Sequence, residues 1–219
     1  MTGRVFEVFE RLRDRYGPQG WWPAETRFEV IVGALLMQQT AWRNVEAAIA
    51  NLKRAGLLEP HRLARASAAA IRRHVRIAGL YRTKPARLRA FCQHLVERAD
   101  GDLDRFFDRP TEAARADLLA QPGIGPETAD SILLYAGRHP IFVVDAYTIR
   151  IGRRIGLFDA EDYRRVQAFF EGNLPRDVGM YREYHALLVA HGKATCRPRP
   201  NCDLCPLLDL CDYGRGRKG

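Results

Sequence analysis

Residues 121–145 read QPGIGPETADSILLYAGRHPIFVVD, and this stretch decides the fold class. The turn PGIG at 122–125 separates two segments in which apolar residues recur three and four positions apart, the spacing of amphipathic helices. The same periodicity fills most of the chain, whereas the strand-like run IFVV at 141–144 is short and leads into the next helical segment. We therefore predict an all-α fold with nine to eleven helices.

The glycines of this turn, Gly123 and Gly125, permit backbone conformations and close approaches that other residues do not. Such a turn can direct its N–H groups, with the N-terminus of the following helix, at a phosphate. An ordinary Pro-Gly turn is the alternative, and the full PGIG pattern favours phosphate binding. Asp145 directly precedes a helical segment, and the residues alone leave open whether it caps that helix or performs chemistry.

Composition favours an anionic partner. The 219 residues are enough for one large domain or two small ones, and they carry a net charge of +9. Of the 35 basic residues, 31 are Arg, whose planar fork suits phosphate, although a compositional bias of the source genome is an equal alternative. No stretch reaches the roughly 18 apolar residues that span a bilayer. The first 17 residues read as an amphipathic helix and not as a secretion signal. We expect a cytoplasmic protein, nucleoid-associated if bacterial, with no membrane partner.

Four of the five cysteines lie within the segment CRPRPNCDLCPLLDLC, at intervals of x5, x2 and x5. In an intracellular protein this pattern indicates a metal site and not disulfides. The intervals are too compact for the separated pairs of four-cysteine zinc sites, so they favour an iron–sulfur cluster over zinc. The predicted ligands are Cys196, Cys202, Cys205 and Cys211.

Two arginines, Arg197 and Arg199, fall between the first two predicted ligands. They are either a solvated surface or a basic finger for a DNA backbone, and the charge and the hairpin favour the second interpretation. Cys92 stands alone in a helical pattern and is expected to be a buried apolar residue. The histidines lack the spacing of a metal site, and we expect His185 and His191 to be structural.

Four landmarks together resemble the endonuclease III branch of the helix-hairpin-helix DNA glycosylases over nearly the whole chain. The resemblance implies a six-helix barrel domain over residues 27–139. It also implies a [4Fe-4S] domain formed by residues 1–26 and 140–219, with a DNA groove between the two. The landmarks are LLMQQTAWRNV at 35–45, GLYRTKPARL at 79–88, QPGIGPETA with VVDAYTIR, and HGKATC before the cysteine loop.

The resemblance also implies roles for single residues. Asp145 would be the catalytic carboxylate, and the hairpin residues Gly123, Ile124 and Gly125 would bind the DNA backbone. Gln39 would fill the hole left by a flipped base, and Leu80 would be a wedge in the opposite strand; such fillers offset part of the cost of flipping. A helix-end amide and a core leucine are the alternatives at these two positions.

The sequence departs from the bifunctional members of the family at Glu127. Those members carry Lys at this position, and Glu cannot form a Schiff base, which favours hydrolysis by water over strand cleavage. A subgroup resembling 3-methyladenine glycosylase of the endonuclease III type has Glu here and a Tyr two residues after the Asp, matched by Tyr147. That subgroup often lacks the cysteine loop, which this chain keeps with a first interval one residue shorter than the usual x6.

Trp42, just after QQT, would line the substrate pocket with Tyr147, because electron-poor alkylated purines stack well on an electron-rich ring. A core position is the alternative for Trp42, and helical spacing favours it. We expect a monomeric base-excision glycosylase that hydrolyses a damaged base, an alkylated purine or an oxidised pyrimidine, from double-stranded DNA. Glu127 would shape the pocket or orient water. The alternatives are a bifunctional glycosylase/lyase using a relocated amine (Lys84 or Lys193), a non-catalytic damage-binding protein and, more distantly, a zinc-dependent binding module.

Overall fold

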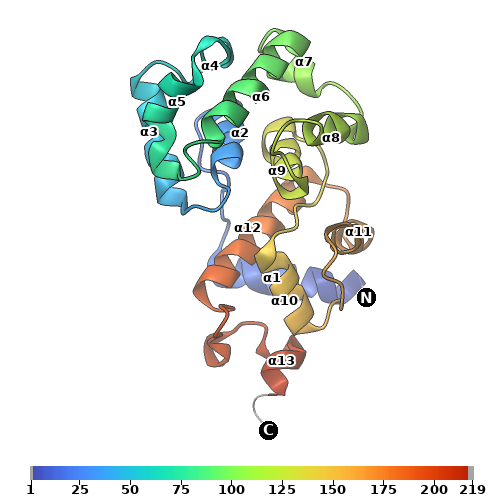
Figure 1. The fold of residues 1–219 in the computed structure, drawn as a ribbon. Helices are drawn as coiled ribbons and strands as arrows, with labels where there is room; N and C mark the ends of the chain where they lie inside the picture. Colours follow the sequence, from blue (N-terminus) through green and yellow to red (C-terminus); the bar gives the residue numbers. More distant parts are fainter. Residues whose placement is uncertain (1, 217–219) are drawn as a thin grey trace. The chain divides into compact units, whose positions relative to one another are not determined.

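The computed structural model describes residues 2–216, and the regular structure of these residues is entirely helical (Figure 1). The predicted all-α class is therefore confirmed. Thirteen α-helices occur in the described part of the chain, so the expected nine to eleven is too low. Four of the helices have only four to six residues, too few to produce a readable apolar period.

The helices are α1 (Thr2–Tyr16), α2 (Arg27–Leu36), α3 (Trp42–Arg54), α4 (Pro60–Arg65), α5 (Ala68–Val75), α6 (Lys84–Ala99), α7 (Leu103–Phe107), α8 (Thr111–Leu119), α9 (Pro126–Ser131), α10 (Ala146–Ile155), α11 (Tyr163–Asn173), α12 (Val178–Ala194) and α13 (Asp212–Arg215). Three 3₁₀ turns, at Arg76–Ala78 (η1), Cys202–Leu204 (η3) and Leu208–Leu210 (η4), complete the described elements together with a π-helical segment, η2 (Ile132–Gly137).

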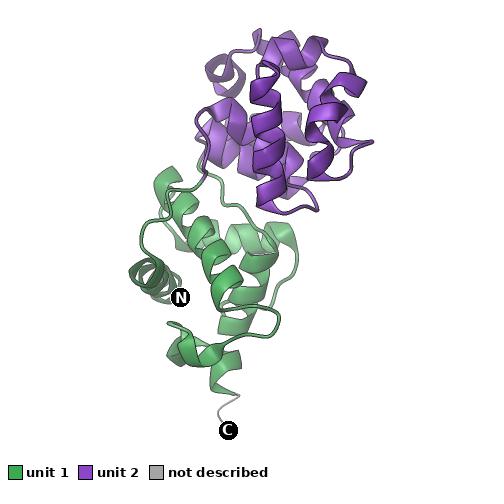
Figure 2. Cartoon of the chain, turned by 90° about the vertical axis from the view of Figure 1, so that its left-hand side faces the viewer, with its two compact units in different colours: residues 1–21, 140–219 green, residues 22–139 purple. Residues whose placement is uncertain are grey.

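The chain divides into two compact units, residues 22–139 and residues 1–21 with 140–219 (Figure 2). In the first unit, α2 is central and buries every residue from Phe28 to Leu36. It packs against α3, α6 and the segment η2 that continues α9. Thr26 fixes where α2 begins, because its side chain accepts a hydrogen bond from the Glu29 N–H. Cys92 on α6 is fully buried, as predicted.

The second unit has an aromatic core. Phe142 stacks on Phe170 with 4.3 Å between ring centroids, and both rings contact Tyr184 of α12. The Tyr184 hydroxyl donates to the Val5 carbonyl at 2.8 Å and so ties α12 to α1. The run 141–144 is buried but extended, and it delivers the chain to α10. No helix among the described residues has the length and apolarity needed to cross a membrane.

Candidate functional site

Asp145 is the N-cap of α10, as the position of the residue before this helix predicts. Its Oδ1 atom accepts hydrogen bonds from the Thr148 backbone N–H at 2.7 Å and from the Thr148 hydroxyl at 2.9 Å. One carboxylate oxygen thus satisfies the helix end. The Oδ2 atom is left to face other groups.

That second oxygen lies 3.5 Å from Nε2 of His185, which comes from α12. Both side chains are largely buried, at 11% and 7% exposure. Burial by itself raises the pKa of Asp145, but the neighbouring His185 and the bonds from Thr148 outweigh it and hold the pKa below its ordinary value. The site therefore presents an ionised carboxylate with little access to water. Such a group stabilises a nearby developing positive charge strongly.

The hairpin depends on its two glycines for different reasons. Gly123 has φ +77°, the left-handed region that favours glycine, and a Cβ there would lie 2.1 Å from Nε of Arg87. Gly125 has φ −93°, which any residue adopts, and its Cβ position has no atom within 4 Å. The expectation of a special backbone conformation is therefore right for Gly123 and wrong for Gly125. Open space beside Gly125 is what a close-approaching phosphate requires.

Ile124, at the tip of the hairpin, buries its side chain in the core of its unit, and its N–H donates to the Gln121 carbonyl at 3.2 Å. The Ile124 N–H is therefore used by the turn itself. The residue anchors the hairpin from within.

A second glutamine of the QQT motif fastens the hairpin. Gln38 donates through Nε2 to the Gly123 carbonyl at 2.9 Å and to the Thr128 hydroxyl at 3.3 Å, and its Oε1 accepts from Arg87 at 3.0 Å. These contacts span up to 90 positions of sequence. Sequence reasoning missed Gln38, although its place beside Gln39 in the motif was a usable signal.

Glu127 is exposed in the first turn of α9, where the helix dipole favours a negative charge. It belongs to the unit of residues 22–139, whereas Asp145 belongs to the other unit. The carboxylate at 127 repels an anion, so any phosphate contact of the hairpin has to come from its backbone.

Gln39 and Leu80 are both exposed and both have positive φ, at +53° and +43°. Leu80 exposes 41% of its surface and is followed by the exposed Tyr81. The core-leucine alternative is therefore wrong for Leu80, and Gln39 lies in a turn beyond the end of α2.

Trp42 begins α3 and is half-buried. Its ring meets that of Trp22 edge-on at 5.5 Å, and Trp22 in turn contacts Tyr135. Trp42 also lines a hollow of about 410 Å³ within its unit. The polar side chains that line this hollow are Glu25, Glu29, Glu46 and Lys53.

Tyr147 lies against α12 in the same unit as Asp145. A Cβ on Gly192 would come within 2.3 Å of the Tyr147 ring, so only glycine at 192 leaves room for it. The Arg150 guanidinium lies 5.1 Å from the centre of the same ring, a cation–π contact. The Tyr147 ring is thus held in place from both sides.

The four clustered cysteines carry free thiols. Burial raises the pKa of Cys205 to about 11, and the nearby Cys196, Cys202 and Cys211 raise it further. Within residues 2–216, no group of three or more His, Cys, Asp or Glu side chains has an arrangement that could hold a metal ion.

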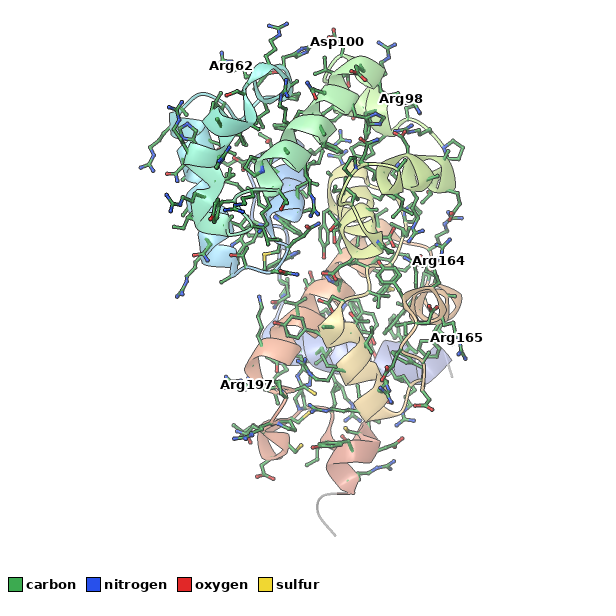
Figure 3. All side chains as sticks on the ribbon, in the orientation of Figure 1. Arg62, Arg98, Asp100, Arg164, Arg165 and Arg197 are labelled. Carbon is green, nitrogen blue, oxygen red and sulfur yellow. The ribbon has the colours of Figure 1, made fainter. Side chains whose placement is uncertain are left out.

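Two arginines of α10 hold this cysteine loop, and neither was predicted from the sequence, because nothing in their local pattern marks them. Arg150 donates to the carbonyls of Cys196 and Gly192, while Arg154 donates to the Arg197 carbonyl at 2.6 Å and approaches the Cys196 sulfur at 3.4 Å. The exposed Arg197, labelled in Figure 3, lies on the loop after α12. Arg199 is exposed on the same loop.

Lys84 and Lys193 are the two candidates for a relocated Schiff-base lysine, and neither amine lies in a cleft as a nucleophile would. Lys84 is buried, and its Nζ donates to the carbonyls of Leu36 and Ala78 at 2.8 and 2.6 Å. Lys193 is exposed, with its Nζ 5.6 Å from the centre of the Trp21 ring. A relocated Schiff-base lysine therefore has no support at Lys84.

A helical hairpin followed by a buried helix-capping aspartate defines a class of DNA repair enzymes, and the family comparison agrees. The model of the HhH-GPD superfamily of base excision DNA repair proteins matches residues 32–176, and the chain belongs to this superfamily. The protein is a base excision repair DNA glycosylase of the endonuclease III-like type, as the sequence landmarks predicted.

Individual relatives agree with this assignment. The protein MJ1434 of Methanocaldococcus jannaschii, provisionally named a DNA repair glycosylase, is 44% identical over 94% of this chain and 95% of its own. The Helicobacter pylori 3-methyladenine DNA glycosylase MagIII, solved with 1,N6-ethenoadenine, is 28% identical with a TM-score of 0.76, covering 86% of this chain and 96% of that one. An endonuclease III trapped covalently on DNA shares the fold, with a TM-score of 0.85 at 22% identity over 100% and 99% of the two chains.

Proposed function

We propose that the protein is a monofunctional glycosylase in which Asp145 is the catalytic carboxylate. The observation that carries the proposal is the ionised, poorly hydrated Oδ2 of Asp145, whose other oxygen is already engaged as the cap of α10. Glu127 at the position of the family lysine supports hydrolysis over Schiff-base chemistry.

The chemistry that follows is a simple substitution at the sugar. The bond between the base nitrogen and C1′ breaks, its electron pair leaves with the base, and positive charge builds on the deoxyribose. A carboxylate beside that charge lowers the barrier electrostatically, and a water molecule then adds at C1′ and loses a proton. Asp145 can serve both parts of this step, first as a counter-charge and then as the acceptor of the water's proton.

We propose alkylated purine as the excised base. Alkylation at a ring nitrogen makes a purine electron-poor and often cationic, and the hollow beside Trp42 offers an indole ring together with three carboxylates against one lysine. The ethenoadenine bound by the H. pylori relative is a modified purine, which supports the same substrate class. Tyr147, packed against Gly192 and Arg150, would also contact the substrate, and Glu127 would shape the pocket or orient water.

The DNA contacts in this proposal come from both units. The hairpin around Gly123 and Gly125 would bind the DNA backbone. Gln39 would fill the space left by the flipped base, and Leu80 would enter the opposite strand as a wedge. Arg197 and Arg199 would contact phosphates from the cysteine loop. The enzyme would act as a monomer on double-stranded DNA. The expected DNA groove between the domains stays a prediction.

We further propose that Cys196, Cys202, Cys205 and Cys211 hold a [4Fe-4S] cluster. The support for this proposal is the compact spacing of the four cysteines, together with the proximity of Cys196, Cys202 and Cys211 to Cys205. The cluster would cross-link the four cysteines and so hold the shape of the loop that carries Arg197 and Arg199. Protein purified without oxygen should contain about four iron and about four acid-labile sulfide per chain. One zinc and no iron would overturn this assignment.

The function is tested with a panel of duplexes that each carry one lesion, scored separately for base release and strand nicking. We expect release of N3- or N7-alkylated purines without nicking, and no adduct when borohydride is added to enzyme with abasic DNA. A trapped adduct would establish the bifunctional alternative. Lesion binding without release of any base, unchanged in Asp145→Asn, would establish a damage sensor.

A further inference from the structure

Two surface residues of the unit 22–139 have backbone conformations that require an explanation. Four non-glycine residues in the described chain have left-handed φ values, and two of them, Asp100 and Arg138, terminate helical segments. The other two are Gln39 and Leu80. A left-handed conformation is unfavourable for a residue that has a Cβ atom, so other contacts must hold these two loops in place.

The holding group is a buried ammonium. Lys84 begins α6, is 1% exposed, and donates from Nζ to the Leu36 carbonyl at 2.8 Å and to the Ala78 carbonyl at 2.6 Å. Leu36 is the last residue of α2 and lies three positions before Gln39, and Ala78 lies two positions before Leu80. One side chain therefore joins the bases of both loops.

A buried ammonium is an unfavourable way to stabilise a fold. Removing an ammonium from water carries a penalty of several kcal/mol, and two neutral carbonyls compensate less than a carboxylate would. Burial accordingly lowers the pKa of Lys84, with a further contribution from Arg87. A methionine of similar length would fill the same volume without that penalty. The charged side chain is therefore explained better by its effect on the geometry of the two loops that it joins than by its effect on stability.

The same turn of α6 also reaches the hairpin. Arg87 lies against Gly123 and donates to Gln38, which in turn donates to the Gly123 carbonyl. The first turn of α6 thus fixes three surface loops, at 37–41, 79–83 and 121–125.

We propose that Lys84 is a positioning residue for base extraction: it holds Gln39 and Leu80 in the strained conformations in which they enter the duplex, with Arg87 aligning the hairpin beside them. The proposal rests on the insertion roles given to Gln39 and Leu80 above. A preformed pair of inserting residues spares the ordering cost at the moment of flipping, so its benefit is confined to bases that must be pulled from a stack.

The test compares one lesion in two settings with Lys84→Met. In a fully paired duplex the base must be extracted, whereas in a single strand it is already accessible. We expect the single-turnover rate of base release to fall at least about tenfold on the duplex and to stay within about twofold on the single strand. Arg87→Leu, whose side chain is only half-buried, should change the same ratio by about threefold.

The matched control is Asp117→Asn, which removes ion pairs to His94 and Arg109 in the same unit and so lowers stability without removing a contact to the loops 37–41 and 79–83. Its duplex-to-single-strand ratio should equal that of the wild type. If Lys84→Met slows both substrates equally, as a general loss of folded protein would, the positioning role is refuted. It is equally refuted if the variant matches the wild type on both.

A readout without catalysis separates this inference from the proposed function. A 2-aminopurine placed opposite an abasic site brightens when neighbouring bases are unstacked by insertion. We expect the wild type to brighten it on binding and Lys84→Met to bind with a weaker signal. Brightening by a wild type that releases no base would refute the proposed function alone, and equal signals from both proteins would refute the role of Lys84 alone.

Discussion

The Nε2 atom of His185 lies 3.5 Å from Oδ2 of Asp145, while Oδ1 of the same carboxylate caps α10 through Thr148. The two oxygens therefore have separate partners. From the sequence, helix capping and catalysis were alternative roles for Asp145. In the structure the two roles are compatible, because each can use a different carboxylate oxygen.

Asp145→Asn should retain the fold and lose the reaction. Asn caps helices as well as Asp does, so the free energy of unfolding should change by less than about 0.5 kcal/mol. The neutral amide cannot balance positive charge on the sugar, and single-turnover base release should fall by about 10²-fold or more. Thermal unfolding and gel-resolved base release measure the two effects. A variant that keeps more than about a tenth of the wild-type rate would remove Asp145 from the mechanism.

His185→Leu should move the acidic limb of the pH–rate profile to higher pH. Base release needs the carboxylate, so activity is present above the pKa of Asp145 and is lost as pH falls through it. Burial raises the pKa of Asp145 and His185 lowers it. The pKa should therefore be higher in the variant without the histidine. His94→Leu is the control, because that histidine pairs with Asp117 in the other unit. An unshifted limb in His185→Leu would mean that His185 does not tune Asp145.

The two hairpin glycines should respond differently to alanine. Gly123→Ala meets both a left-handed φ and the Arg87 side chain, so it should destabilise the protein by about 1 kcal/mol or more and weaken DNA binding. Gly125→Ala meets neither obstacle in the protein, so it should unfold like the wild type and yet weaken DNA binding. Thermal unfolding and fluorescence anisotropy on one duplex compare them. Wild-type affinity in Gly125→Ala would show that no phosphate approaches there.

Glu127→Lys should create a borohydride-trappable adduct with abasic DNA, because it supplies an amine at the position where bifunctional relatives carry one. The wild type should give none under the same conditions. Glu112→Lys reverses the charge in the first turn of the neighbouring helix α8 and controls for stronger non-specific binding. Trapping by both variants, or by neither, would contradict the assignment of position 127 to the sugar.

Asp117 should contribute to stability above pH 4. Burial alone would raise its pKa, but hydrogen bonds from His94, Arg98 and Arg109 lower it to about 2. A depressed folded-state pKa gives stability that is complete above the unfolded value near 3.8 and is lost as pH falls toward 2.

Asp117→Asn should therefore lower the free energy of unfolding at pH 7 by about 2 kcal/mol, with a smaller difference from the wild type at pH 2, as measured by urea titration. Asp104→Asn, whose carboxylate is 89% exposed and pairs with Arg27, should change stability by less than about 0.5 kcal/mol. Equal effects at the two positions would contradict this account of Asp117, whose partner Arg98 is labelled in Figure 3.

The features that could be predicted from the sequence are those that depend on residues close together in the chain. The helical class follows from apolar spacing within single segments, and the cap at Asp145 follows from one residue and the helix after it. The gathering of four cysteines follows from intervals of two to five residues, and the hydrolytic expectation follows from the identity of residue 127. Residues separated by so few positions stay close together however the rest of the chain packs.

Relationships between distant segments could be read only from the packed structure. His185 lies 40 positions from Asp145, and Lys84 reaches a carbonyl 48 positions away. The buried lysine at position 84 and the exposed, strained leucine at position 80 both contradict what their residue types suggest. Packing decides such cases, because burial and backbone strain at one residue depend on the contacts that the rest of its unit supplies.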